Sequence, residues 1–425
     1  MVSFKLPAAA EAAGFRPCPQ CRPDRLAGLV GWSEPEPLCR AVRLILEGAL
    51  DEAGEACLAA RLGLSGRHLR RLFITRLGVT PDGLARSRRA HFARRLLDDT
   101  DLSITEIAFA AGYGTGRQFN RDCQRIFRAT PSQLRASRSS PCRLAADGGL
   151  TVRLWYSGAL DWEALAAFLA DRAMPGVEHV AGQIYRRTID VDGDPGVLEL
   201  GPGGSGHLQL RLHLPHWAGL MHLVARARRI ASLDQDITEP ARSQATDVGR
   251  LPGSRPIIPG AWDPYETGTA AIIAQHHAPE ATRNLLSGLV HHLGKPVPGL
   301  THYRLTHAFP PPGVLAAAEA SLAAMGLHRD QARAVSAFAD AVATGAIRLD
   351  GSAPLDQLIT SLTAIPNLGV STAHYIAARA GEPDAHPASD PALSRAIPLP
   401  SSSHGAPTGL PRRGPQASQQ RGRYH

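Results

Sequence analysis

An internal repeat constrains the fold of this chain more than any other feature of its sequence. When residues 40–136 are slid along themselves, one pattern of apolar, basic and turn residues returns at an offset of 50 positions. The matched pairs are Leu69 with Phe119, Arg71 with Arg121, Phe73 with Cys123, Thr80 with Thr130, and Pro81 with Pro131. Each copy is a short helical unit with one apolar face, so the repeat predicts two such units packed side by side.

The first copy, residues 57–73, has the pattern of a helix-turn-helix. Gly63 suits a tight turn between two helices, and the hydroxyl of Ser65 can cap the second helix. The apolar face of that second helix carries Leu69, Leu72 and Phe73. The side chains left to face outward are Arg67, His68, Arg70 and Arg71.

The second copy, residues 104–127, repeats this pattern with Gly112 and Tyr113 at the turn. Its later helix begins with side chains that can hydrogen-bond base edges in a major groove, namely Arg117, Gln118, Asn120 and Arg121. The alternative interpretation is a helical bundle with a solvated, arginine-rich face.

Together, residues 38–138 resemble the DNA-binding domain of the AraC/XylS family of bacterial transcription regulators. The resemblance implies tandem helix-turn-helix motifs and double-stranded DNA as the partner. Cys123 and Arg128 stand where the first copy has Phe73 and Gly78, and we expect them to loosen the core and the C-terminal turn of the second unit.

The placement of charge also favours a polyanionic partner. Residues 1–140 contain 22 of the 46 Lys and Arg residues and 14 of the 38 Asp and Glu residues. The rest of the chain therefore has 24 basic and 24 acidic residues. The excess positive charge therefore belongs to the first third, where it can neutralise phosphates. The sequence contains no apolar run of membrane-spanning length and no secretory pattern, so we expect a cytoplasmic, nucleoid-associated protein without a membrane partner.

With 425 residues and 44% hydrophobic residues, the chain is too long for one ordinary core, so several domains are expected. In residues 148–250, the stretches 185–191 and 197–200 alternate like strands around a turn at residues 193–196. The other elements predicted there are a helix at 162–172 and a strand at 208–214, which is followed by an apolar segment at 217–230. This part is predicted to be an α+β domain.

Residues 258–397 return to a helical pattern. Helices are predicted at 269–293, 313–325, 331–344 and 355–364. Residues 398–425 are rich in Pro, Ser, Gly and Arg and are expected to form a disordered tail. The predicted fold class is therefore a multidomain, mainly α protein with one α+β domain.

A helix–hairpin–helix pattern lies near the end of this helical part. Residues 362–377 place a tight turn containing Asn367, Leu368 and Gly369 between two helices, and such a turn can present backbone N–H groups to a DNA phosphate without reading sequence. Asp390 follows in a segment rich in Pro, Ala and Ser. A lone Asp is more often a helix cap or a solvated acid, so the hairpin in front of it carries the functional interpretation.

These features resemble the helix-hairpin-helix DNA glycosylases of the AlkA type, from about residue 150 to residue 397. The resemblance implies that Asp390 is the catalytic aspartate and that Tyr375 belongs to the base pocket. A base alkylated on a ring nitrogen is a good leaving group, and a buried carboxylate can stabilise the oxocarbenium-like sugar that remains. In this sequence Asn367 replaces the family's first hairpin glycine, and Ser371 replaces a tryptophan.

A half zinc site is predicted at the N-terminus. Cys18 and Cys21 form a Cys-x-x-Cys pair in residues 1–30, which resemble the end of the Ada zinc domain. Structural zinc needs four ligands, so zinc is expected only if further ligands precede Met1, and otherwise no cofactor is expected.

The sequence thus predicts a DNA-3-methyladenine glycosylase that excises alkylated purines and is fused to an AraC-type regulator module. Two alternatives stay open: a transcription regulator with a catalytically inactive glycosylase-like domain, and a truncated product.

Overall fold

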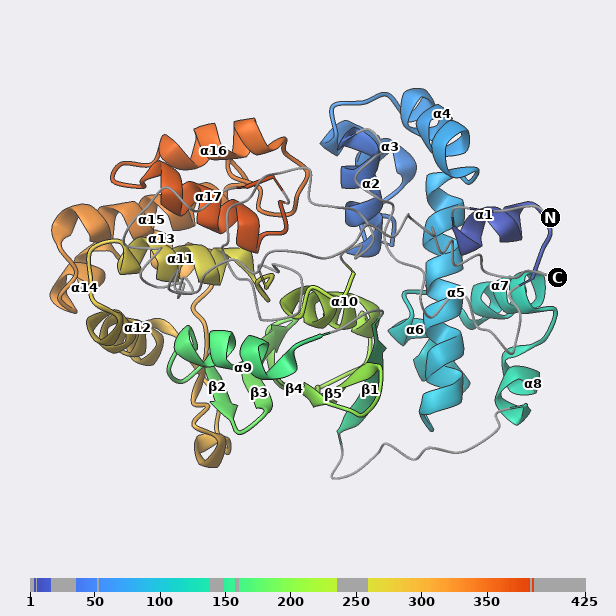
Figure 1. Ribbon diagram of the computed structural model, residues 1–425, viewed down its shortest axis with the longest axis horizontal. Helices are drawn as coiled ribbons and strands as arrows, with labels where there is room; N and C mark the ends of the chain where they lie inside the picture. Colours follow the sequence, from blue (N-terminus) through green and yellow to red (C-terminus); the bar gives the residue numbers. More distant parts are fainter. Residues whose placement is uncertain are drawn as a thin grey trace, which may run out of the picture.

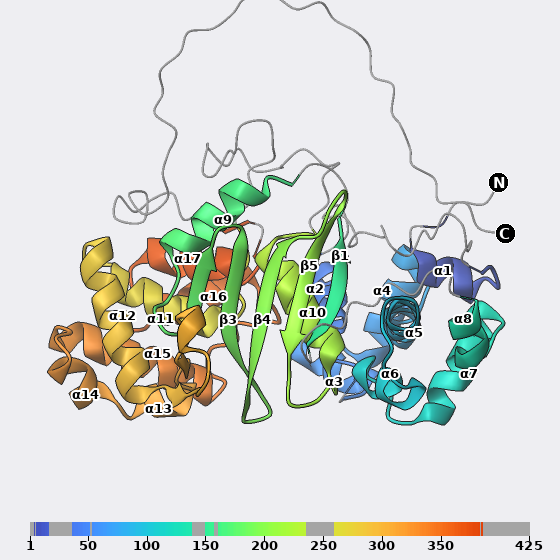
Figure 2. The same ribbon diagram turned by 90° about the horizontal axis from the view of Figure 1, so that it is seen from below.

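The computed structural model describes residues 4, 6–16, 36–51, 53–137, 149–156, 160–234, 259–382 and 384–385. Figure 2 shows three parts in a row: the tandem helix-turn-helix at one end, a sheet in the middle and a helical domain at the other end. The described part is mainly helical with one five-stranded sheet, which confirms the predicted fold class.

The regulator module is built from eight helices in the described part of its sequence. They are α1 (Pro7–Ala12), α2 (Glu36–Leu46), α3 (Glu55–Arg61), α4 (Gly66–Leu77), α5 (Pro81–Asp99), α6 (Ile104–Ala110), α7 (Gly116–Phe127) and α8 (Pro131–Ala136). Figure 1 shows α5 as a long central helix, with α4 toward one end and α7 beside it.

The predicted repeat is present in the geometry of the two units. Thr80 and Thr130 each cap the following helix by accepting a backbone N–H bond, and Pro81 and Pro131 are the first helical residues. Ser65 caps α4 as expected, because its hydroxyl accepts the N–H of His68.

The two departures from the repeat do not shorten the second unit. Cys123 is fully buried in α7, where burial raises the pKa of its thiol to about 12. Arg128 ends α7 in the left-handed conformation at φ 57°, and Gly78 ends α4 at φ 72°. Both helices have 12 residues, and Arg128 ends α7 at the position where Gly78 ends α4. The arginine therefore adopts a backbone conformation that favours glycine.

The α+β domain has an antiparallel sheet in the order β1-β5-β4-β3-β2. Its elements are β1 (Leu150–Trp155), α9 (Trp162–Asp171), β2 (Glu178–Ala181), β3 (Ile184–Val191), β4 (Asp194–Pro202), β5 (His207–His213) and α10 (Leu220–Ile230). The predicted turn at residues 193–196 was wrong in position. Val191 pairs with Asp194, and the turn is Asp192-Gly193 with φ of 55° and 91°, as a two-residue hairpin requires.

The helical domain follows after residue 259. Its elements are α11 (Pro264–Ala274), α12 (Pro279–Leu293), β6 (Lys295–Pro296), η2 (Thr301–Tyr303), β7 (His307–Ala308), α13 (Pro312–Ala316), α14 (Glu319–Ala324), α15 (Arg329–Ala343), α16 (Leu355–Thr363) and α17 (Val370–Arg379). Two predicted helices, 269–293 and 313–325, are each broken in two. In the first, Pro279 starts a new helix and holds Ala278 in an extended conformation at ψ 156°.

The described residues form three hydrophobic clusters. Buried residues of the second helix-turn-helix unit and of the sheet form one continuous hydrophobic cluster, while the first unit and the helical domain each have their own. Within the described ranges, no helix is both long and apolar enough to cross a membrane. Asp390, Cys18, Cys21 and the tail at 398–425 lie outside the described residues.

Candidate base pocket and DNA-binding surfaces

A cavity of about 510 Å³ lies between the α+β domain and the helical domain. Its wall comes from α9 and the loop after it, from the break between α11 and α12, and from α17. Tyr375 of α17 lines the cavity, as does Trp262, and both side chains are at least nine-tenths buried. The cavity therefore offers aromatic surface of the kind that holds a planar ring.

One face of this cavity is rich in arginine. The guanidinium carbons of Arg172 and Arg379 lie 4.0 and 5.1 Å from the centroid of the Phe168 ring. Burial lowers the pKa of Arg172, and the adjacent phenol of Tyr375 opposes that shift. Arg283 of α12 also lines the cavity. A negatively charged group placed here would be stabilised by these cations.

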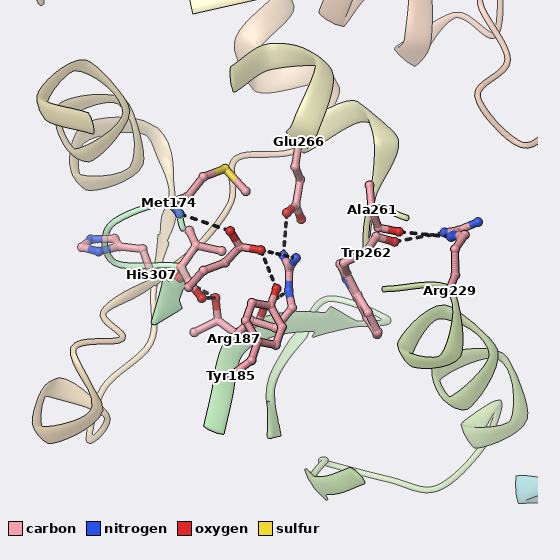
Figure 3. Close-up of polar contacts among 11 residues, drawn as sticks. Met174, Tyr185, Arg187, Arg229, Ala261, Trp262, Glu266 and His307 are labelled. Atoms are coloured by element: carbon pink, nitrogen blue, oxygen red, sulfur yellow. Dashed lines mark hydrogen bonds and ion pairs between the residues drawn. The ribbon is translucent and has the colours of Figure 1, made fainter. Parts of the chain in front are cut away.

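A buried ion network holds the two domains together beside the cavity (Figure 3). Arg187 of β3, with its side chain 2% exposed, binds Glu178 at 3.0 Å and Glu266 of α11 at 2.5 Å. The hydroxyl of Tyr185 donates to Glu178 at 2.6 Å. Burial raises the pKa of Glu266 to about 7, although Arg187 opposes the shift. Glu178 and Tyr185 also line the cavity, so the network fixes part of its wall.

Trp262 is positioned through its backbone. Arg229 of α10 donates to the carbonyl of Ala261 from Nε and to the carbonyl of Trp262 from Nη2, both at 3.1 Å (Figure 3). The guanidinium groups of Arg187 and Arg226 lie 5.4 and 5.6 Å from the Trp262 ring centroid. Trp262 is therefore held by arginines of β3 and α10.

The hairpin between α16 and α17 is tied to the edge of the cavity by one side chain. Gln275 accepts the N–H of Gly369 at 3.0 Å and the Thr372 hydroxyl at 2.7 Å, and donates to the carbonyl of Asn367 at 3.0 Å. Gln275 itself lines the cavity. The same side chain thus binds the hairpin and forms part of the cavity wall.

Two of the hairpin N–H groups are bonded within the protein. The N–H of Leu368 donates to the carbonyl of Ile365 at 3.2 Å, and that of Gly369 is taken by Gln275. The Leu368 side chain is buried in the core of the helical domain. The exposed surface begins instead at Asn367, which adopts φ 63°, and at Val370, where α17 starts without a side-chain cap.

The predicted DNA-contacting side chains of α4 differ in how they are engaged. Arg67, His68, Arg70 and Arg71 are all exposed. Arg70 binds Glu55 of α3 at 2.7 Å, and Arg71 lies 3.3 Å from the His68 ring nitrogen. Three of these four side chains are therefore in contact with a partner within the protein.

On α7, Arg117, Asn120 and Arg121 are exposed and Gln118 is half-buried. Across the residues that the structure describes, neither Arg117 nor Arg121 forms an ion pair. The arginines of α7 are therefore more available to a DNA partner than those of α4 that already have partners in the protein.

Sequence reasoning missed Gln275, Trp262 and the Arg187–Glu266 pair. Each makes contacts across long sequence separations, such as 94 positions between Gln275 and Gly369. A local signal was Pro279, which starts α12 and so breaks the predicted long helix four residues after Gln275. Asp390 lies beyond the described residues, so its predicted role stays a prediction.

Two family models match stretches within the first 263 residues of the chain. A family model described as a helix-turn-helix domain matches residues 58–137, and one described as the AlkA N-terminal domain matches residues 151–263. Among solved structures, a 3-methyladenine DNA glycosylase from Archaeoglobus fulgidus aligns with 57% of this chain and 85% of its own, at 18% identity and a TM-score of 0.44.

Two sequence relatives are more informative. A DNA-3-methyladenine glycosylase 2 of Escherichia coli is 30% identical over 52% of this chain and 77% of its own length. A probable bifunctional transcriptional activator/DNA repair enzyme AlkA of Mycobacterium tuberculosis is 34% identical over 90% of this chain and 78% of its own length. The predicted resemblance to an AraC-type and AlkA-type fusion is confirmed, while the Ada-like zinc segment stays a prediction. This chain belongs to the family of bifunctional AlkA proteins, which join a transcriptional activator to a DNA repair enzyme.

Proposed function

We propose that this protein removes alkylated purines from duplex DNA by hydrolysing the N-glycosidic bond, and that its tandem helix-turn-helix binds operator DNA. The observation that carries the proposal is the cavity of about 510 Å³ that Gln275 links to the hairpin. A base inside a duplex is out of reach, so a glycosylase needs a pocket for the extruded nucleotide beside a backbone-binding element.

The cavity fits an extruded purine in chemistry as well as in size. Tyr375 and Trp262 supply aromatic surface against which a base can stack. In the proposed reaction, the bond between the sugar C1′ and the base nitrogen breaks and the cationic alkylated base leaves as a neutral molecule with the bonding electrons. The oxygen of water then adds to C1′ and the water loses a proton to solvent. Asp390 is proposed to stabilise the positive charge that develops on the sugar.

The test is release of free base from a duplex carrying 3-methyladenine or 7-methylguanine. We expect release by the full chain, and loss of at least about a hundredfold in Asp390→Asn, since one electrostatic stabiliser contributes on this scale. Asp384→Asn is the matched control, because Asp384 is exposed and lies six positions earlier. Equal release by wild type and Asp390→Asn would contradict the catalytic role, and no release by either would leave a regulator with an inactive glycosylase-like domain.

The regulator function rests on the exposed cations of α7. Substituting Arg117 or Arg121 by Ala should weaken binding to genomic fragments that the wild type selects and reduce the preference for them over unrelated duplexes, because these side chains are expected to contact base edges. An unchanged preference would contradict this. We further propose that the protein acts in the cytoplasm at the nucleoid. Zinc at Cys18 and Cys21 stays conditional on further ligands, and metal analysis of the purified protein tests it.

A further inference from the structure

One face of α2 in the regulator module contacts both of the domains that form the base pocket. Arg43 and Glu47 are four positions apart, and the N–H of Glu47 donates to the carbonyl of Arg43 at 3.0 Å, so the two side chains lie on the same face. Arg43 binds Glu382, just after α17, at 2.5 Å. Glu47 binds Arg229 of α10 at 2.5 Å. The regulator module is therefore attached to the α+β domain as well as to the helical domain.

The helix α10 is held by the regulator module at two points. His222 and Arg229 are seven positions apart, which places them two turns apart on one face of α10. His222 lies 3.2 Å from Asp51, and Arg229 binds Glu47. Gly48 lies between the two acids at φ 101°, and a Cβ there would overlap the His222 ring. The segment that carries both acids is therefore packed closely against α10, which lies below α2 in Figure 1.

All three nitrogens of the Arg229 guanidinium group have a partner. Nη1 binds Glu47, while Nε and Nη2 donate to the carbonyls of Ala261 and Trp262 (Figure 3). The group is planar, so the carboxylate at Nη1 fixes the plane in which the other two nitrogens meet their carbonyls. Burial lowers the pKa of Arg229, and the negative charge of Glu47 is the strongest influence that opposes this shift. Glu47 therefore stabilises Arg229 in its charged form and in this orientation.

The segment that Arg229 binds is part of the pocket wall. Gly260 and Trp262 both line the cavity of about 510 Å³. The N–H of Gly260 donates to the carbonyl of Arg229 at 3.1 Å, and the N–H of Ala261 donates to the carbonyl of Arg379 at 2.8 Å. A Cβ at Gly260 would lie 2.5 Å from Cγ of Arg229, so the two backbones are in close contact. A displacement of the Arg229 side chain should therefore displace this wall and the indole that it carries.

We propose that Glu47 of the regulator module is a positioning residue for base excision, and that it acts through Arg229 on Trp262. The inference rests on the proposed glycosylase function. A base that stacks in the pocket needs the indole at one depth and tilt, and a displacement of about 1 Å can lower a rate by about a hundredfold. The regulator module is then a structural part of the enzyme in addition to binding operator DNA.

The experiment compares single-turnover release of 7-methylguanine from a duplex with the dissociation constant of an undamaged duplex, using the full chain. The variants are Glu47→Ala, Glu47→Gln, Arg229→Gln and the double variant Glu47→Ala/Arg229→Gln. The matched control is Glu36→Ala, because Glu36 is an acid of the same helix whose side chain is 60% exposed and pairs only within α2 among the described residues. A second readout needs no DNA: fluorine NMR of fluorotryptophan-labelled protein, with the Trp262 resonance assigned by its absence from Trp262→Phe.

We expect Glu47→Ala to lower the single-turnover rate about tenfold and to leave the dissociation constant within about twofold of wild type, because the hairpin is untouched. Glu47→Gln should lose less, since its amide oxygen still accepts from Arg229. The double variant should lose no more than Arg229→Gln alone, because both substitutions remove the same link. The Trp262 resonance should shift in Glu47→Ala and stay in place in Glu36→Ala.

The proposal is overturned if either the rate or the Trp262 resonance of Glu47→Ala matches that of Glu36→Ala. Losses that multiply in the double variant also overturn it, because Glu47 would then act by a route other than Arg229. If the wild type releases no base, the proposed glycosylase function fails. The Trp262 resonance then decides by itself whether Glu47 positions the pocket wall.

Discussion

Arg43 and Glu382, 339 positions apart in the chain, form an ion pair of 2.5 Å that joins the regulator module to the end of α17. Both side chains are largely buried, at 15% and 8% exposed. Since α17 begins at the hairpin and carries Tyr375, this pair connects the regulator module to the helix that lines the base pocket.

Breaking this pair should uncouple the modules. Arg43→Met leaves Glu382 buried without its cation and two carbonyls without a donor, which should cost about 3 kcal/mol of unfolding free energy. Calorimetry should show the modules of the variant unfolding in separate transitions. The control Arg333→Gln loses only an exposed pair and should change stability by less than about 1 kcal/mol. An unchanged unfolding profile in Arg43→Met would mean that the apolar contacts alone hold the modules.

The hairpin should depend on Gln275. Gln275→Ala removes all three hydrogen bonds to residues 367, 369 and 372 while leaving the apolar core intact. We expect base release to fall about tenfold, mainly through weaker DNA binding, because the hairpin loses its fixed position. The measurement is kcat/KM on a methylated duplex, with Gln209→Ala on the exposed side of β5 as the control. A parallel loss in the control would point to general instability.

Glu266 should make stability depend on pH. Burial raises its pKa from 4.5 to about 7, so the folded state holds this proton more tightly than the unfolded chain does. Its contribution to stability is therefore full below pH 4.5 and is lost as pH rises through about 7. Thermal unfolding from pH 5 to 8 should show a decline in wild type that is smaller in Glu266→Gln. Glu280→Gln, on the exposed face of α12, should behave as wild type, and identical profiles for all three would contradict the prediction.

The repeat supplies a matched pair of backbone substitutions. Arg128 occupies left-handed backbone at φ 57°, so Arg128→Gly should stabilise the protein by about 0.5–1 kcal/mol. Gly78 occupies the same position of the first copy at φ 72°, and Gly78→Ala should destabilise it by about 1 kcal/mol. Shifts in melting temperature of opposite sign are expected. Shifts of the same sign would show that side-chain contacts, and not backbone conformation, dominate at these positions.

The sequence by itself determined the local elements and the order of the parts. The cap at Ser65 and the alternation in β3 are short-range signals, because they depend on neighbours within one or two turns. The offset of 50 residues shows that one such local pattern occurs twice in the chain. They were sufficient to predict two helix-turn-helix units, an α+β domain and a helical domain with a hairpin. The same reasoning misplaced the turn at residues 193–196 and merged α11 with α12, since boundaries depend on single residues such as Gly193 and Pro279.

Only the tertiary structure decided which side chains meet. Gln275 reaches the hairpin, Arg187 reaches Glu266, and Arg43 reaches Glu382 across 94, 79 and 339 positions. Such contacts carry no periodicity, because they form when separate elements bury their faces against one another and must still satisfy their polar groups. The base pocket and its link to the regulator module both arise from this packing, and for that reason neither could be located from the sequence.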